Sequence, residues 1–182
     1  MSAEGARPEP PVEVVRAESA ERALIEGLFQ FYVYDFSEFQ PAGSPDFELN
    51  DEARYDPYPY LGQYWADEAC VPLLIKVAER VVGFALINAF SHSGGHVDHS
   101  MAEFFVLRKY RLGGVGAFAV QEILRRYPGR WEIAIAARNT PALAFWPRTV
   151  KALGCVEDLS TLEMDEPLWR GPILRFVSMG AA

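Results

Sequence analysis

A glycine-rich segment in the second half of the chain has the spacing of an anion-binding turn. It reads Arg111-Leu112-Gly113-Gly114-Val115-Gly116 and follows a β-type run that ends near Leu107. A turn of this kind between a strand and a helix presents several backbone N–H groups at the positive end of the helix. Glycines let a phosphate approach the backbone without obstruction by side chains. The segment therefore predicts a site for a phosphate-bearing ligand.

A dinucleotide-binding site is the main alternative for such a turn. That site has Gly-x-Gly-x-x-Gly after the first strand, and an acidic residue about 20 residues further on that binds the ribose. Here the spacing differs, the turn follows the fourth expected strand, and no acidic ribose ligand is evident. The sequence therefore disfavours NAD as the ligand.

A single carboxylate, Glu103, lies within the apolar strand that precedes the turn. Strand alternation predicts that one face carries Met101, Glu103 and Phe105 and the other carries Ala102, Phe104 and Val106. Burying a carboxylate between apolar neighbours is costly, and desolvation raises its pKa. Glu103 is therefore the candidate general base, able to take a proton from an ammonium group through a water molecule. The alternative is a structural role, as a buried salt-bridge partner or a carboxylate at a sheet edge.

Two other groups of side chains could have a chemical role. His92, His96 and His99, with Asp98, are potential metal ligands, but the serines and glycines around them are typical of a hairpin loop and not of a rigid site. We therefore predict no metal. The residues 37–67 hold seven aromatic residues, namely Phe39, Phe47, Tyr55, Tyr58, Tyr60, Tyr64 and Trp65. Their favoured role is to pin a long loop to the core, and the alternative is a wall of a substrate pocket.

Composition limits the class of protein. The 182 residues are 50% apolar and 13% aromatic, which is enough for one domain with a buried core. The net charge of −8, with no basic block, argues against nucleic-acid binding and suits cationic small molecules or basic peptides. Cys70 and Cys155 define no disulfide framework. No apolar run approaches the ~20 residues of a membrane span, and residues 1–11 do not read as a signal peptide, so we expect a cytoplasmic protein.

The pattern of elements predicts a mixed α/β (α+β) fold. Residues 1–11 are expected to be a flexible tail, and 12–182 to form the domain. Strands are expected over 12–16, 71–77, 81–90, 101–107, 131–136 and 173–178, and helices over 20–36, 60–67, 116–127 and 140–153. The first helix is expected to be capped by Ser19. The sheet would be antiparallel at first and partly parallel later.

Several of these motifs together resemble the GCN5-related N-acetyltransferase (GNAT) family. Arg111-x-x-Gly114-x-Gly116 resembles the family's (Gln/Arg)-x-x-Gly-x-(Gly/Ala) pyrophosphate loop, and Val106 falls where the family's strand ends in valine. The run from Asn139 to Trp146 resembles the Asn-x-x-Ala-x-x-x-Tyr helix, and Leu153-Gly154-Cys155 resembles the Leu-Gly-Phe that closes it. The close match covers about residues 101–155.

The resemblance implies a single domain with a central sheet of six or seven strands, flanked by helices and splayed between the fourth and fifth strands. It also implies acetyl-CoA as cosubstrate. The backbone of Val106 would pair with the pantetheine arm, and Arg111 would lie beside the pyrophosphate. The N–H groups that would hold the pyrophosphate belong to Leu112, Gly113, Gly114, Val115 and Gly116. Asn139 would contact the pantetheine or orient the splay, unless it is only a turn residue before the helix.

The sequence departs from the family at three positions. Trp146 replaces the tyrosine that often protonates the departing thiolate, and an indole N–H is not a usable acid. A thiolate with a pKa near ~8.5 can leave without an obligatory proton donor, so catalysis is not excluded. Arg108 replaces a proline before the turn, and Pro147 predicts a kink in the last helix.

The resemblance predicts an N-acetyltransferase in which an amine attacks acetyl-CoA directly, with Glu103 as the base and Trp146 at the position of the usual acid. The acceptor is not identified, although Glu103 and the acidic composition favour a cationic small molecule. Asp98 or His99 could assist on the acceptor side. The alternative is a non-catalytic acyl-CoA-binding or regulatory module. Neither nucleic acid nor membrane is expected as a partner, and a homodimer is left open.

Overall fold

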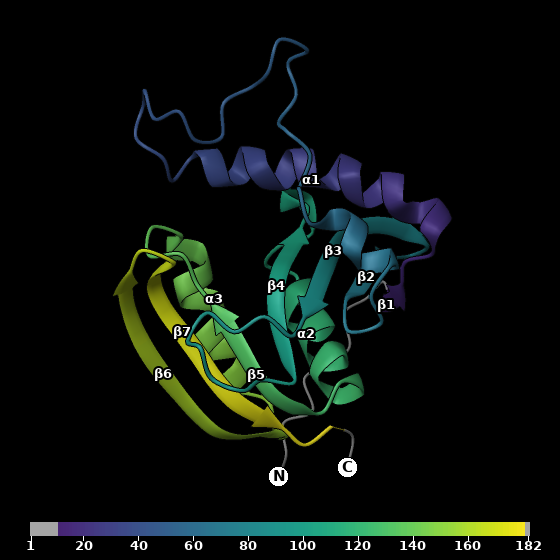
Figure 1. The fold of residues 1–182 in the computed structure, drawn as a ribbon. Helices are drawn as coiled ribbons and strands as arrows, with labels where there is room; N and C mark the ends of the chain where they lie inside the picture. The colour runs from purple at the N-terminus through teal and green to yellow at the C-terminus, as the bar shows by residue number, and fades with distance from the viewer. Residues whose placement is uncertain (1–10, 181–182) are drawn as a thin grey trace.

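The computed structural model describes residues 11–180 and contains one seven-stranded sheet with helices on both faces (Figure 1). The strands are β1 (Val12–Arg16), β2 (Val71–Val77), β3 (Arg80–Asn88), β4 (His99–Val106), β5 (Gly129–Ala134), β6 (Val156–Glu166) and β7 (Trp169–Ser178). The α-helices are α1 (Arg22–Ser37), α2 (Val115–Arg126) and α3 (Thr140–Lys151). Three short 3-10 helices are η1 (Ser19–Glu21), η2 (Leu61–Trp65) and η3 (Arg108–Tyr110).

The sheet order is β1-β2-β3-β4-β5-β7-β6, with β4 and β5 as the parallel pair and the other neighbours antiparallel. The predicted mixed sheet and its helices are confirmed, with element ends shifted by a few residues. The predicted tail lies, apart from Pro11, outside the described residues. No helix among the described residues is long and apolar enough to cross a membrane.

The sequence-based prediction misplaced the first helix cap and missed one strand. Glu18, not Ser19, caps the first helical turn, because η1 precedes α1 and the Glu21 carboxylate accepts the Glu18 N–H at 2.9 Å. Strand β6 was not located, because its residues are almost all exposed and show no alternation of apolar and polar side chains. A strand exposed on both faces lacks the pattern by which a core-facing strand is recognised.

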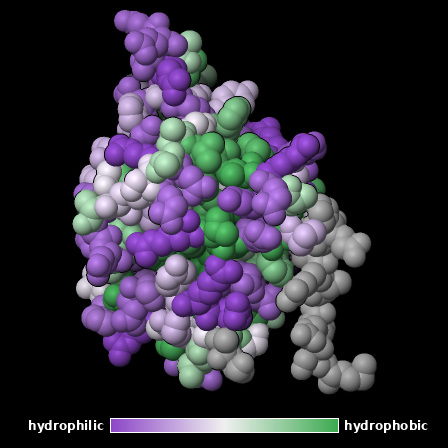
Figure 2. All heavy atoms as spheres, turned by 90° about the vertical axis from the view of Figure 1, so that its right-hand side faces the viewer, coloured by the Kyte–Doolittle hydropathy of each residue, from purple (hydrophilic) through white to green (hydrophobic). Residues whose placement is uncertain are grey.

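Two apolar clusters occupy the two faces of the sheet. Helices α2 and α3 cover one face, where residues of α2 at helical spacing are buried, namely Val115, Ala119, Val120, Ile123 and Leu124. Helix α1 and η2 cover the other face, over β2, β3 and β4, with Ile25, Phe29 and Tyr64 in the core. Figure 2 views the side of the molecule that carries β1, where hydrophobic atoms show at the centre of a mostly hydrophilic surface.

The sheet opens between β4 and β5, as predicted. Only His99 with Trp131 and Ser100 with Glu132 are paired in register, after which the two strands diverge (Figure 1). From Met101 to Val106, β4 therefore has no strand partner on its β5 side. This leaves backbone groups at the open end of the splay available to other partners.

A β-bulge in β4 sets the direction of Glu103. Leu86 pairs with Glu103 but Ile87 pairs with Met101, so Ala102 is an extra residue in the ladder. As a result Met101 packs in the cluster under α2 and α3, whereas Glu103 faces α1. The prediction that Met101 and Glu103 share a face was wrong, because simple alternation does not hold across a bulge.

Candidate active site

The glycine-rich turn lies at the open end of the splay and leads into α2. Leu112 and Gly114 both have left-handed backbone conformations, with φ of 65° and 82°, so the chain reverses over a few residues. None of the hydrogen bonds formed within residues 11–180 uses the N–H groups of Leu112, Gly113 or Gly114. The first N–H groups of α2, from Val115 onward, have no partner within the helix. The turn therefore presents free donors at a helix N-terminus, the geometry expected of an anion site.

The glycines of this turn leave room where other residues would place a Cβ atom. A Cβ at Gly113 or Gly114 would meet no atom within 4 Å, and a Cβ at Gly116 would touch the Phe145 ring at 3.4 Å. The Cβ positions of Gly113 and Gly114 are thus free of protein atoms. The predicted phosphate-binding residues, Leu112 to Gly116, form this turn and the start of α2.

Arg111 is engaged with the strand end and with α1. Its Nε donates to the Val106 carbonyl at 2.7 Å, its guanidinium lies 5.4 Å from the centre of the Phe105 ring, and it pairs with Asp35. Arg108 also donates to Asp35, at 2.8 Å. Two residues predicted to bind the cofactor, Val106 and Arg111, are therefore hydrogen-bonded to each other. Sequence reasoning did not single out Asp35, which lies on a different element.

Glu103 lies partly buried beneath α1 and is surrounded by aromatic rings. The Tyr32 hydroxyl donates to Glu103 Oε2 at 2.5 Å. Burial raises the pKa of Glu103 to about 7, and hydrogen bonding from Tyr32 and Tyr58 opposes this rise. The pKa of Tyr32 is itself raised, mainly by burial and then by the Glu103 charge. A carboxyl that titrates near neutral pH, beside donors that hold its orientation, is suited to proton transfer.

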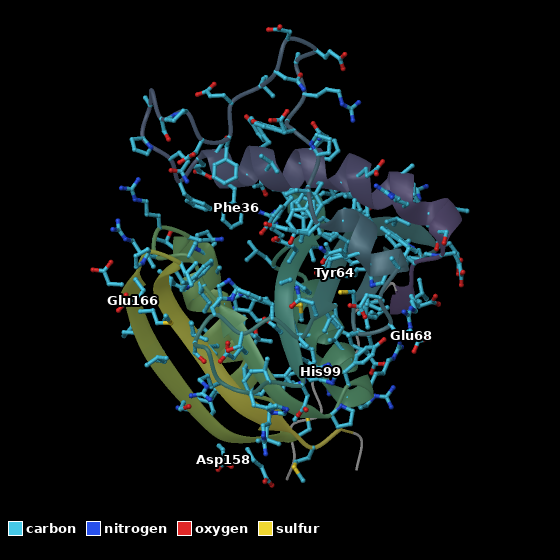
Figure 3. The ribbon with its side chains drawn as sticks, viewed as in Figure 1. Phe36, Tyr64, Glu68, His99, Asp158 and Glu166 are labelled. Carbon is cyan, nitrogen blue, oxygen red and sulfur yellow. The ribbon has the colours of Figure 1, made fainter. Side chains whose placement is uncertain are left out.

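The rings around Glu103 come from elements far apart in the sequence. Tyr32 packs on Phe36 at 4.9 Å and on Phe105 at 5.9 Å between ring centres, and Tyr58 stacks on Phe29 at 4.8 Å. Figure 3 shows Phe36 near the end of α1, above the region where the sheet opens. Tyr58 was recognised only as one of seven loop aromatics, and Tyr32 only as part of a helical repeat. No short-range signal connected either of them to Glu103.

Asn139 and Trp146 lie on α3, behind the sheet. Asn139 caps the helix, its Oδ1 accepting the Ala142 N–H at 3.1 Å, which is the turn role considered from the sequence. Trp146 is 6% exposed and packs edge-on against Phe104 at 5.1 Å. Trp146 therefore contributes to packing behind β4, and its position offers no acid.

The three histidines have separate neighbours. His92 contacts Trp169, His96 contacts Arg130, and His99 contacts the Pro128 carbonyl at 3.2 Å. In the part of the chain that the structure describes, no three potential ligands gather around a metal site. His99 lies at the closed end of the splay, roughly 13 Å along β4 from Glu103. Its position, with Asp98 bound to the Arg130 N–H, does not support a role beside the base.

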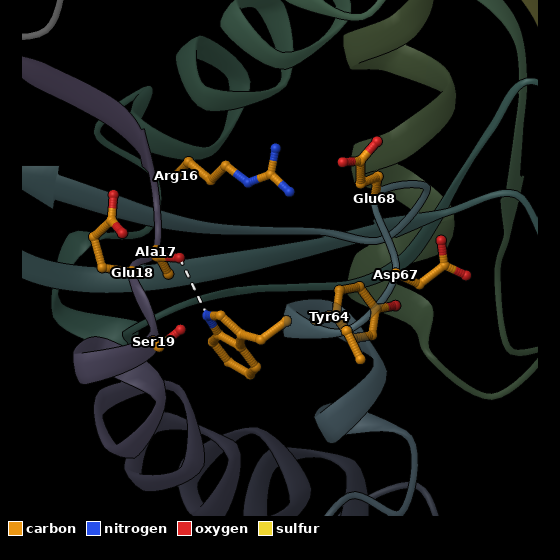
Figure 4. A pocket seen from close by; sticks show the side chains of 9 residues that line it. Arg16, Ala17, Glu18, Ser19, Tyr64, Asp67 and Glu68 are labelled. Carbon is orange, nitrogen blue, oxygen red and sulfur yellow. Dashed lines mark hydrogen bonds between the residues drawn. The ribbon is translucent and has the colours of Figure 1, made fainter.

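A separate hollow of about 430 Å³ lies between η2 and the end of β1 (Figure 4). Its lining consists of Arg16, Ala17, Glu18, Ser19, Tyr64, Trp65, Ala66, Asp67 and Glu68. The Trp65 indole N–H donates to the Ala17 carbonyl at 3.2 Å beside it. The lining includes neither Glu103 nor any residue of the glycine turn, so this hollow is distinct from the candidate active site.

Comparisons with known proteins identify the family. A family model described as the acetyltransferase (GNAT) family matches residues 32–150. No curated protein matches the chain. An acetyltransferase of the GNAT family from Staphylococcus aureus Mu50 superposes with a TM-score of 0.59, at 10% identity, over 92% of this chain and 99% of that chain.

Two further structures share the fold and were solved with a cofactor. YncA from Salmonella typhimurium, with acetyl-CoA, has a TM-score of 0.54 at 17% identity, covering 94% of this chain and 95% of that chain. The PaiA N-acetyltransferase from Thermoplasma acidophilum, with coenzyme A, has a TM-score of 0.58 at 7% identity, covering 92% and 99%. Because the family model spans more than half of the sequence and the sheet opens at the same place as the motifs predicted, the chain belongs to the GNAT acetyltransferase family.

Proposed function

We propose that this protein is an acetyl-CoA-dependent N-acetyltransferase in which Glu103 is the general base and the acceptor is a cationic amine. The observation that carries the proposal is the position of Glu103: a carboxyl with a pKa of about 7 on the strand that borders the splay, near the end of that strand that leads into the glycine turn. Acetyl-CoA is the cosubstrate of the family, and two structures of the same fold contain acetyl-CoA or coenzyme A.

The residues of the turn suit the phosphates of acetyl-CoA. The N–H groups of Leu112, Gly113 and Gly114 are free of protein partners within the described residues, and the Cβ positions of the two glycines are open. The β5 side of Val106 is open to a pantetheine arm once Arg111 releases the Val106 carbonyl. Arg111 would then be free to neutralise phosphate charge, so one side chain would exchange a protein partner for the cofactor.

The surroundings of Glu103 suit an ammonium group with an apolar body. The carboxylate attracts the charge, and the rings of Tyr32, Phe36 and Phe105 form the aromatic surface that cations favour. Once Glu103 accepts a proton, the neutral amine attacks the thioester carbonyl carbon, the C–N bond forms and the C–S bond breaks. The nitrogen then passes its second proton to water, which leaves the neutral amide and the free thiolate. The thiolate leaves unassisted because its pKa is near ~8.5, which agrees with the buried position of Trp146.

Two measurements test this proposal. Acetyl-CoA at a hundredfold excess over its dissociation constant should stabilise the fold by about 2.7 kcal/mol, which raises Tm by about 5 to 11 °C for a chain of this size, whereas NAD should have little effect. Turnover of acetyl-CoA with a panel of polyamines, aminoglycosides, amino acids and peptides, read by product mass, should yield an N-acetylated amine. Stabilisation by acetyl-CoA without turnover of any amine would instead identify a non-catalytic acyl-CoA-binding module.

A further inference from the structure

The loop between β3 and β4 is fastened to a buried carboxylate. It crosses the face of β5 and β7 on the side opposite α3 (Figure 1), where Glu132 of β5 is 0% exposed. Ser91 Oγ donates to Glu132 Oε2 at 3.0 Å, Ser93 Oγ donates to Oε1, and Arg175 Nε lies 3.5 Å from Oε1. The two serines flank His92. The carboxylate therefore fixes the backbone on both sides of His92 and determines where that ring lies.

His92 packs against Trp169, at the start of β7, with 4.7 Å between ring centres, and against Phe90 at 4.9 Å. His92 Nδ1 and Trp169 Nε1 are both buried, and neither has a hydrogen-bond partner within residues 11–180. Buried polar side-chain atoms are nearly always paired in folded proteins. Two such atoms in contacting rings lack the partners that buried polar groups ordinarily have, which makes this place a candidate for contact with a ligand.

Trp169 belongs to β7, across the splay from β4, which carries Glu103. Trp169 begins β7 beside the end of β5, where the Ala137 N–H donates to the Arg170 carbonyl at 3.1 Å. The next residue, Arg138, reaches the Phe39 carbonyl just after α1, at 3.5 Å. The ends of β5 and α1 and the start of β7 thus meet around the open side of the splay. An amine held at Glu103 on β4 would extend across this opening toward Trp169 and His92.

We propose that Trp169 and His92 bind the end of the acceptor that is remote from its amine, through hydrogen bonds to a carbonyl or carboxylate oxygen. This inference rests on the proposed acetyl transfer to an amine. An indole N–H only donates, so its partner must carry an acceptor atom. Burial lowers the pKa of His92, with Glu132 opposing, so near neutral pH the ring is uncharged and keeps one N–H donor. Because His92 is only half-buried, its ring can turn to admit the oxygen.

Matched acceptors test the inference. Straight-chain primary amines of equal length, ending in a methyl, a carboxamide or a carboxylate group, are compared by kcat/KM over a series of chain lengths. At the best length, the parent protein should prefer an oxygen-bearing amine over the alkylamine by roughly tenfold, the worth of about one hydrogen bond. Trp169→Phe keeps an aromatic ring but removes the N–H. It should therefore abolish the preference, so that kcat/KM for the oxygen-bearing amines falls to about the value for the alkylamine in the same variant.

Trp65→Phe is the matched control, because it also removes an indole N–H hydrogen bond but lies beside β1, at the opposite edge of the sheet from β7 and β6. This variant should retain the full preference. Equal kcat/KM for all three amines in the parent, or an equal loss for all three in Trp169→Phe, would overturn the specificity role and leave acetyl transfer standing. Absence of turnover with every amine would overturn both proposals.

Discussion

At the scale of single residues, the chemistry of this protein depends on which way one carboxylate points. Glu103 faces α1 because Ala102 is an extra residue in the β4 ladder, and there it meets Tyr32. The sequence predicted Glu103 as the base from its apolar neighbours alone. It did not predict Tyr32 as its partner, because the two are 71 residues apart and only the packing of α1 on the sheet joins them.

Glu103→Gln should lower turnover by about 10²–10⁴ while leaving acetyl-CoA binding unchanged, because Gln keeps the volume and still accepts a hydrogen bond from Tyr32 but cannot take a proton. In the parent, kcat/KM should fall as the pH drops below about 7, the pKa of Glu103. The variant should lose that inflection. Parental turnover in Glu103→Gln from pH 6 to 9 would show that the base is elsewhere.

The same substitution has a predicted effect on stability. The folded-state pKa of Glu103 lies above the ordinary value of 4.5, so folding favours the protonated form, and this contribution is lost as the pH rises through about 7. Glu103→Gln is neutral at every pH. Its Tm should therefore match the parent near pH 4.5 and exceed it above pH 7. A lower Tm at high pH would indicate that the Glu103 carboxylate is a structural partner.

At the scale of elements, short stretches of sequence were sufficient to predict the glycine turn. They were insufficient to predict the contacts that join it and the β3–β4 loop to other elements. The glycine turn and α2 could be predicted because the glycines, the strand before them and the helical repeat after them are contiguous. The engagement of Arg111 by Asp35 could not, since it joins residues 76 positions apart through the position of α1. The fastening of the β3–β4 loop by Glu132 was missed for the same reason: Ser91 and Glu132 meet only through the sheet.

Gly113→Val tests the turn more cleanly than a change at Gly114, whose φ of 82° would strain any side chain. A Cβ at Gly113 meets no protein atom and its backbone conformation is ordinary, so the fold should be retained. If phosphate contacts this backbone, the affinity for coenzyme A, measured by calorimetry, should fall at least tenfold. Gly154→Val is the control, because its Cβ is equally unobstructed but lies after α3. Equal affinity for coenzyme A in the two variants would show that the turn only begins α2 and does not contact phosphate.

At the scale of the whole molecule, the order of the other elements and the opening between the fourth and fifth strands could be predicted, and strand β6 could not. Strands β2 to β5 bury apolar residues, and their patterns reveal them. Strand β6 is held by its pairing with β7 and leaves most of its side chains in solvent, so nothing in its own composition marks it as a strand. In this chain, the strands that could be predicted from the sequence are those that bury apolar side chains.

The exposure of β6 also has a consequence for solubility. A long edge strand offers unpaired backbone groups to a second sheet, which makes it a potential start of aggregation. This edge carries five acidic residues, Glu157, Asp158, Glu163, Asp165 and Glu166, so two copies brought edge to edge would repel. Replacing Glu163 and Asp165 by Gln and Asn should increase light scattering on concentration, whereas replacing Glu48 and Asp51, exposed in the loop after α1, should not. Equal light scattering from both double variants would mean that the net charge, and not the acidic side chains of β6, keeps the molecules apart.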